Sequence, residues 1–123
     1  MFYHSLLALS LTLLIASSAY AETIFITPAL IAPNGGLMHC RVVNGHTTQT
    51  IQAMIQILDL NGDVVSDSNT AAGPLEVRVT SSADDNARYC IVTLVSGPKT
   101  KVRVSISVTD SSGSTVSALE GRR

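Results

Sequence analysis

Apolar and polar side chains alternate with a period of two along most of residues 24–108, and this pattern restricts the fold more than any other feature of the chain. In the clearest stretch, residues 102–109, valine and isoleucine alternate with arginine, serine and threonine. Successive side chains of a β-strand point to opposite faces of a sheet, so this spacing predicts half-buried strands. Shorter stretches of the same kind occur at 38–43, 51–58, 75–80 and 89–95.

The alternation also predicts which side chains face inward. Around the two cysteines, one face carries Met38, Cys40 and Val42, and in the other segment Cys90, Val92 and Leu94. The opposite face of 89–95 also carries apolar residues, which leaves open that both faces of that segment are covered. Within 75–80, the apolar set that alternates with polar residues is Leu75, Val77 and Val79. A helix over 50–58 is the alternative for that segment, because Ile51, Ile55 and Leu58 would share one helical face. The β-branched isoleucines and the short length favour a strand.

Turn signals separate these segments. They are Pro33-Asn34-Gly35-Gly36, Asn44-Gly45, Asn61-Gly62, Gly73-Pro74, Gly97-Pro98 and Ser112-Gly113. The Asn61-Gly62 pair lies between two apolar pairs and predicts a hairpin with a type I′ turn, in which both central residues have positive φ. Seven or eight short antiparallel strands at this spacing predict an all-β sandwich.

The first 21 residues have the pattern of a secretory signal peptide. An apolar run over 6–16 is followed by Ser17-Ser18-Ala19-Tyr20-Ala21, an A-x-A site that predicts cleavage between Ala21 and Glu22. The segment before the run lacks Lys and Arg, which leaves a retained membrane anchor as the alternative. The apolar run is shorter than the ~20 residues that span a bilayer. We therefore expect a secreted or periplasmic protein whose single domain is residues 22–123.

Export bears on the two cysteines, Cys40 and Cys90, which are the only ones in the chain. In an oxidising compartment an even pair is expected to form a disulfide. Closing a loop of about fifty residues stabilises a fold by about 4 kcal/mol in the chain-entropy model. The expected disulfide thus supplies a large share of the stability of so small a domain.

With a cysteine in the second and in the penultimate major strand, residues 24–109 resemble immunoglobulin-like and fibronectin-type-III-like sandwiches. In those families a bridge between the second and sixth strands pins the two sheets together, which the resemblance implies for this chain. Tyr89 lies one residue before Cys90, not two as in the antibody-type tyrosine corner, and the chain has no Trp. The segments around Cys40, Asn61, Cys90 and Val104 are also similar to small exported bacterial proteins of unassigned function. That similarity implies a fold and a compartment only.

Charge and composition argue against several classes of partner. The chain has 8 basic and 9 acidic residues and a formal net charge of −1. Nucleic-acid binding needs a basic stripe that neutralises phosphates, so we expect no nucleic-acid partner. We also expect no membrane span once the signal has been removed.

Two short motifs suggest metals, and each has a simpler explanation. Asp59-Leu60-Asn61-Gly62-Asp63 resembles the start of a calcium loop, but Val64 and Thr70 stand where such a loop needs Gly and Glu. His39, Cys40 and His46, with Met38 and Met54, suggest copper or zinc. Strand alternation places Cys40 inward and His39 outward, so the two do not ligate one ion. We therefore expect no metal and no cofactor.

Catalytic patterns are equally weak. Neither His39 nor His46 lies near a G-x-S-x-G nucleophile elbow. The acidic residues expected in turns are Asp59, Asp63, Asp67, Asp84, Asp85 and Asp110. Paired cysteines offer no thiolate. The sequence predicts a protein that is not an enzyme.

Two hypotheses about function remain. The first is an exported structural or protein-binding β-sandwich, with an unknown protein partner. Its candidate surfaces are the hydroxyl-rich face of Arg103, Ser105, Ser107 and Thr109 and the loops at 44–50 and 81–88. The second is a subunit of a surface fibre, of the pilus or adhesin type, that assembles by strand exchange. It is motivated by the alternating apolar segment 23–27, which could pair with a second copy. The simpler explanation is that this segment is the first strand of its own sandwich.

Overall fold

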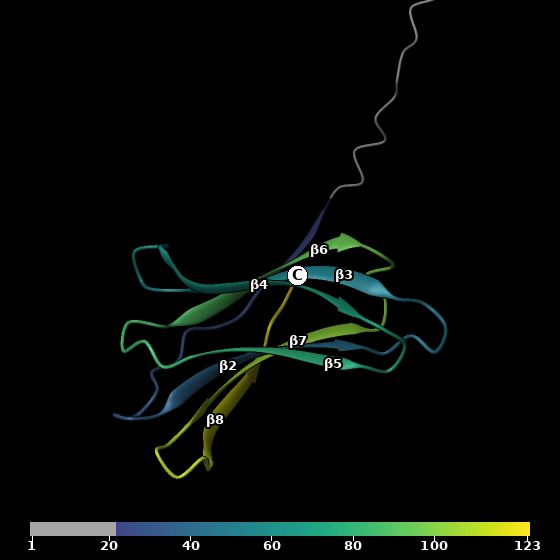
Figure 1. Cartoon of the computed structure of the whole chain (residues 1–123). Helices are drawn as coiled ribbons and strands as arrows, with labels where there is room; N and C mark the ends of the chain where they lie inside the picture. The colour runs from purple at the N-terminus through teal and green to yellow at the C-terminus, as the bar shows by residue number, and fades with distance from the viewer. Residues whose placement is uncertain (1–21) are drawn as a thin grey trace, which may run out of the picture.

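The computed structural model describes residues 22–123 (Figure 1). The predicted signal peptide, residues 1–21, lies outside the described residues, as does the Ala21 side of the predicted cleavage site. The described part consists of strands without a helix: β1 (Thr23–Ile26), β2 (Leu37–Asn44), β3 (Ile51–Leu58), β4 (Val64–Ala72), β5 (Val77–Ser82), β6 (Tyr89–Ser96), β7 (Val102–Thr109) and β8 (Thr115–Glu120). The strand at 51–58 is therefore confirmed over its helical alternative.

The eight strands form two antiparallel sheets, which Figure 1 shows as two layers. The first sheet has the order β1-β6-β3-β4 and the second sheet the order β5-β2-β7-β8. The prediction of a single all-β sandwich is confirmed. Because β6 and β2 each have a neighbour on both sides, the two strands that carry the cysteines lie in the interior of their sheets.

The core lies between the sheets and follows the predicted alternation on β2 and β6. The residues that share a face with each cysteine there are all buried: Met38, Cys40, Val42, Cys90, Val92 and Leu94. Beside β2 in the second sheet, β7 contributes four more buried residues: Val102, Val104, Ile106 and Val108. Period-two burial of Val and Ile on both sheets is the expected basis of sandwich stability.

The disulfide between Cys40 and Cys90 joins the two layers, as predicted. It links β2 of the second sheet to β6 of the first, with Cα atoms 6.3 Å apart and 50 residues of sequence separation. Both residues are fully buried. The cross-link therefore joins an interior strand of one sheet to an interior strand of the other.

The predicted inward face of β5 is wrong. Val77 and Val79 are 47% and 48% exposed, and Leu75 precedes the strand. Pairing with β2 determines the orientation: Thr80 lies opposite Cys40, so Thr80 points inward and the valines point outward. Thr80 is buried accordingly. At this edge strand the register with β2 outweighs the apolar character of the valines.

The Asn61-Gly62 hairpin is present, but the predicted type I′ turn is wrong. Gly62 has a φ of +83°, whereas Asn61 is not among the residues with positive φ. The backbone N–H of Gly62 donates to the Asp59 carbonyl, and the Asp59 carboxylate accepts from the N–H groups of Asn61 and Asp63. The β7–β8 hairpin repeats this arrangement with Asp110 and Gly113, whose φ is +86°. An aspartate that caps its own turn, followed by a glycine, therefore builds both hairpins.

The first and last segments of the described chain meet at one side of the sandwich. β1 pairs with β6 of its own sheet, and its Phe25 is buried. Beyond β8 the chain crosses to the first sheet, where Arg122 and Ile26 exchange backbone hydrogen bonds of 2.9 and 3.0 Å. Thr27 extends the pairing, because its hydroxyl accepts from the Cys90 N–H. Strand β1 thus completes the sandwich within its own chain.

Candidate functional site

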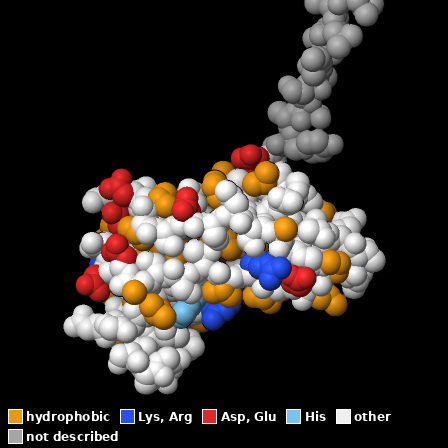
Figure 2. Space-filling view, viewed as in Figure 1, with side chains coloured by type: hydrophobic (Ala, Val, Ile, Leu, Met, Phe, Trp, Pro, Cys, Tyr) orange, Lys and Arg blue, Asp and Glu red, His pale blue; other side chains and the backbone are white. Residues whose placement is uncertain are grey.

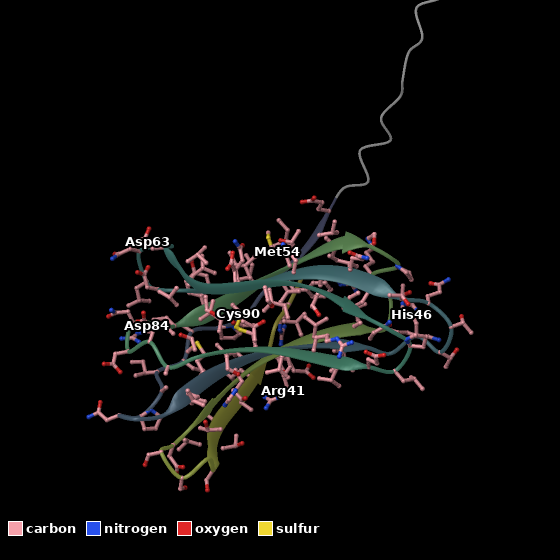
Figure 3. All side chains as sticks on the ribbon, viewed as in Figure 1. Arg41, His46, Met54, Asp63, Asp84 and Cys90 are labelled. Atoms are coloured by element: carbon pink, nitrogen blue, oxygen red, sulfur yellow. A yellow bond between two sulfur atoms is a disulfide. The ribbon has the colours of Figure 1, made fainter. Side chains whose placement is uncertain are left out.

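The outer face of the second sheet carries the most distinctive group of side chains in the described structure. Strand register places His39, Arg41 and Val43 of β2 between β5 and β7. We call this surface the Arg41 face, defined by His39, Arg41, Val43, Val77, Val79, Ser81, Arg103, Ser105, Ser107 and Thr109. Arg41 points away from the core on this side of the molecule (Figure 3). In Figure 2, a histidine and basic side chains lie among hydrophobic ones along the lower border.

His39 links three strands across this face. Its Nδ1 atom is 2.6 Å from the Ser81 hydroxyl of β5, and its Nε2 atom is 3.1 Å from the Thr109 hydroxyl of β7. Partial burial, and to a smaller extent the charge of Arg41, lowers the pKa of His39. Both ring nitrogens contact hydroxyl groups, which donate or accept. The hydrogen bonds therefore suit the neutral and the protonated ring alike.

Arg41 contributes a positive charge to the middle of the face. One of its Nη atoms donates to the Ser107 hydroxyl. Its cross-strand neighbours are Val79 on β5 and Ser105 on β7. The ion pairs found within residues 22–123 join Arg78 to Glu76 and Arg103 to Glu120, and neither involves Arg41. Its guanidinium thus has no carboxylate partner in the described part of the chain.

The predicted hydroxyl-rich face belongs to this surface, with a difference in exposure. Arg103 is exposed and Ser105 is half-buried, whereas Ser107 and Thr109 are 3% and 8% exposed. The Ser107 hydroxyl is hydrogen-bonded to Arg41, and the Thr109 hydroxyl is hydrogen-bonded to His39. The solvent-exposed part of the Arg41 face is therefore formed largely by β2 and β5. No pattern in the sequence indicated that these two strands share a face with β7.

The candidate loop at 44–50 is organised by Asn44, which has no exposed surface. Its side-chain amide donates to three carbonyl oxygens, those of Gln49, Ala72 and Gly73, and its carbonyl oxygen accepts from the His46 N–H. This side chain holds the loop against the end of β4. The sequence signalled only a turn at Asn44-Gly45, so the structural role of Asn44 was missed.

The second candidate loop, 81–88, begins two residues later than predicted, because β5 extends to Ser82. Asp84 organises the loop: its carboxylate accepts from the Asn86 N–H, and its carbonyl accepts from the Ala87 N–H. The Arg88 guanidinium donates to the Asp85 carbonyl. Local capping accounts for these polar groups.

The residues of the copper or zinc motif are not brought together. Met38 is buried in the core, and Met54 lies on the outer side of the first sheet (Figure 3). His39 lies on the Arg41 face, and His46 contacts the Pro98 carbonyl through Nε2 at 3.2 Å. Within residues 22–123, no three His, Cys, Asp or Glu side chains gather in a way that would hold a metal ion.

Five of the six aspartates lie in turns or loops as predicted, and Asp67 is the exception. It lies within β4, opposite Gln56, on the outer side of the first sheet. Asp110 caps the β7–β8 turn, where the Ser112 hydroxyl and then the Ser114 N–H lower the pKa of its carboxyl. The carboxylates of Asp59, Asp84 and Asp110 accept hydrogen bonds from the backbone of their own turns.

Two surface hollows lie away from the Arg41 face, and a third, of about 290 Å³, includes Arg103 and Glu120 at its border. One of about 580 Å³ lies beside the first strand and the β6–β7 turn, between Glu22 and Lys99. Another of about 360 Å³ lies at the Asp59 turn and includes Arg88. The Arg41 face is an open sheet surface without an enclosing wall. A shape of this kind suits contact with another macromolecule better than enclosure of a small substrate.

Comparison with known proteins supports the fold and goes no further. No protein-family model matches the chain, and no curated protein matches it. The fold is that of a disulfide-linked β-sandwich. It is similar to the crystal structure of Thermotoga maritima 1070, with a TM-score of 0.56 and 14% identity over 80% of this chain and 91% of that chain. At this identity the likeness concerns the fold alone. Within residues 22–123, no helix has the length and apolar character to cross a membrane.

Proposed function

We propose that the chain is an exported protein without catalytic activity, whose β-sandwich binds a protein partner through the Arg41 face. The observation that carries this proposal is Arg41 itself, a guanidinium without a carboxylate partner in residues 22–123, beside the exposed valines Val77 and Val79. Arginine bordered by apolar surface is typical of residues that contribute most to protein interfaces. The buried disulfide supports export to an oxidising compartment.

Ser81 and His39 are hydrogen-bonded, as a serine nucleophile and its base would be, but the groups around them favour a binding role. A serine nucleophile needs a base that is oriented by a carboxylate, and donors that stabilise an oxyanion. The second nitrogen of His39 contacts the hydroxyl of Thr109. β2 is paired on both sides, so its backbone N–H groups are taken up by the sheet. These contacts support a role for the ring in binding.

We also propose kinship with immunoglobulin-like sandwiches. The bridge between the second and sixth strands and the pairs β2–β5 and β3–β6 match that arrangement. Two positions differ, because β7 lies beside β2 and β1 lies beside β6, where immunoglobulin domains place their first and last strands respectively. The proposed kinship therefore concerns the central strands.

A capture experiment tests the binding proposal. The domain 22–123 is immobilised and exposed to the envelope fraction of its native cells, alongside Arg41→Gln and Val79→Asp variants. Gln52→Ala, an exposed change on the first sheet, is the matched control. We expect a specific protein that the control retains and both face variants lose. Equal capture by all four proteins, or turnover of a cell-wall substrate, would contradict the proposal.

Export itself is tested by the intact mass of the protein recovered outside the cytoplasm. We expect the mass of a chain that begins at Glu22. A mass that includes residues 1–21 would show that the segment is retained.

A further inference from the structure

We propose that the Arg41 face recognises the side-chain carboxylate of an acidic residue in a partner segment whose flanking residues are apolar. This inference rests on the proposed binding function and specifies its chemistry. Three features of the described structure lead to it: the charge of Arg41, the hydroxyl groups on one side of it and the valines on the other.

Charge matching favours a carboxylate over a doubly charged group. Arg103 lies 3.8 Å from Glu120, and these two opposite charges offset each other, which leaves the charge of Arg41 unbalanced on the face. A single carboxylate balances a single guanidinium, whereas a phosphate group would bring excess negative charge. Guanidinium has five N–H donors in a planar fork that matches carboxylate geometry, and the hydrogen bond to Ser107 uses only part of this capacity.

The surroundings of Arg41 indicate what flanks the carboxylate. In one direction lie His39, Ser81 and Ser107, all with hydroxyl or ring nitrogen groups. In the other direction lie Val43 and Val77, with Arg103 opposite Val43 on β7 and paired with Glu120, and Val79 is directly opposite Arg41. Val77 and Val79 are about half exposed, so an apolar side chain that covers them gains hydrophobic contact. A segment with a glutamate beside valine-like residues complements this arrangement.

Binding is expected to be coupled to protonation of His39. The groups that face His39 are Arg41 on its own strand, Ser81 on β5 and Ser107 and Thr109 on β7, with Ala118 beyond them on β8. None of them is acidic. A carboxylate bound at Arg41 offsets the charge that disfavours the imidazolium ring, so the bound state holds the His39 proton more tightly. Affinity therefore rises as the pH falls towards the range in which histidine titrates.

The test uses two capped peptides, acetyl-Thr-Val-Glu-Val-Thr-amide and its glutamine counterpart, titrated into isotope-labelled domain 22–123 and followed by NMR. We expect the glutamate peptide to shift amide signals of residues 39–43 and 103–107 and to bind about tenfold more tightly than the glutamine peptide. Arg41→Gln should abolish this preference, and Gln52→Ala on the other sheet should retain it. Acetate and phosphate titrations distinguish a peptide site from general anion binding.

The pH arm distinguishes this site from a nonspecific attraction. Between about pH 8 and pH 6, affinity for the glutamate peptide should rise about threefold in the wild-type domain and stay level in His39→Gln. Peptide should also raise the pKa of His39 in a direct NMR titration. If Arg41→Gln does not fold, the two peptides on the wild-type domain decide the question.

The outcomes separate the two proposals. Equal binding of both peptides, or phosphate binding tighter than the glutamate peptide, overturns the carboxylate inference. If the captured partner still depends on Arg41 in that case, the binding function stands and only its chemistry is wrong. If the glutamate peptide binds through Arg41 but no partner is captured, the carboxylate site stands and the proposed function fails.

Discussion

Asn44 has no exposed surface, and its side chain holds the β2–β3 loop against the end of β4 through four hydrogen bonds. A buried amide of this kind stabilises a fold chiefly because its partners would otherwise lose their hydrogen bonds. This side chain therefore accounts for the ordered position of one of the two candidate loops.

We expect Asn44→Ala to lower the free energy of unfolding by about 1–3 kcal/mol, because the carbonyls of Gln49, Ala72 and Gly73 lose their donor. Urea denaturation measures the change. Asn61→Ala, an exposed asparagine in a turn, is the matched control and should change stability by less than about 0.5 kcal/mol. A similar effect of both substitutions would remove the role assigned to Asn44.

His39 should make stability depend on pH. Burial and Arg41 lower the pKa of His39 from its ordinary value of 6.5, so the unfolded chain binds the proton at a higher pH than the folded chain. The stabilisation is fully present above that ordinary value and is lost as the pH falls through the pKa of the folded state. Denaturation between about pH 7 and pH 5 should show this loss in the wild-type domain.

The control for this prediction is the other histidine of the described chain. His39→Gln should flatten the pH dependence in that interval, whereas His46→Gln should keep it. An unchanged slope in His39→Gln would place the titrating group elsewhere.

At the scale of the strand and turn, Leu75 occupies a conformation that suits another residue. It has a φ of +59° at the third position of a turn in which the Glu76 N–H donates to the Gly73 carbonyl. With Pro74 before it, this is the pattern of a type II turn, whose third position favours Gly or Asn. The side chain of Leu75 is exposed, so it gains little from burial in return.

We therefore expect Leu75→Asn to raise the free energy of unfolding by about 1 kcal/mol, because asparagine tolerates positive φ better than leucine. Leu60→Asn is the matched control, since Leu60 is equally exposed in a turn but is not among the residues with positive φ. Thermal denaturation of both variants measures the difference. A gain of the same size at Leu60 would mean that lost surface hydrophobicity, not the backbone, is responsible.

The strands show where sequence reasoning succeeded. On β2 and β6 the alternation places a cysteine on the same face as Met38 and Val42 in one strand and as Val92 and Leu94 in the other, so these buried residues were predictable. On β5 both valines are apolar but face outward. Pairing with β2 places Thr80 opposite the buried Cys40, so Thr80 faces inward and the valines, at the alternate positions, face outward. An edge strand buries too little to determine its own orientation.

The site was predictable only in part for a related reason. Arg103, Ser105, Ser107 and Thr109 share a face by local alternation, and that was recognised. The contacts of His39 with Ser81 and of Arg41 with Ser107 join residues 42 and 66 positions apart. Such contacts depend on strand register, for which the sequence of a single chain has no local signal.

For the whole molecule, the position of β1 bears on the fibre hypothesis. β1 pairs with β6 of the same chain and buries Phe25, so the sandwich needs no strand from a second copy. Assembly by strand exchange would require β1 to leave this position. The hypothesis stays a prediction, and it has a direct consequence for stability.

We expect the unfolding midpoint of domain 22–123 to stay constant over a roughly hundredfold dilution, because an intramolecular β1 makes folding independent of concentration. Size-exclusion chromatography, with and without residues 22–28, accompanies the dilution series. A midpoint that falls on dilution, together with oligomers that vanish when residues 22–28 are removed, would support exchange between copies.

The cross-link between Cys40 and Cys90 has a mechanical consequence. When the two ends of the domain are pulled apart, residues 41–89 between the cysteines carry no tension, because the sulfur–sulfur bond bypasses them. Only the flanking segments can lengthen, including β1, β7 and β8. In a force-extension experiment, reduction should add about 170 Å of contour length at roughly 3.4 Å per residue. Intact, the bond makes the centre of this sandwich inextensible, so an applied load would strip the outer strands and leave the middle of the chain closed.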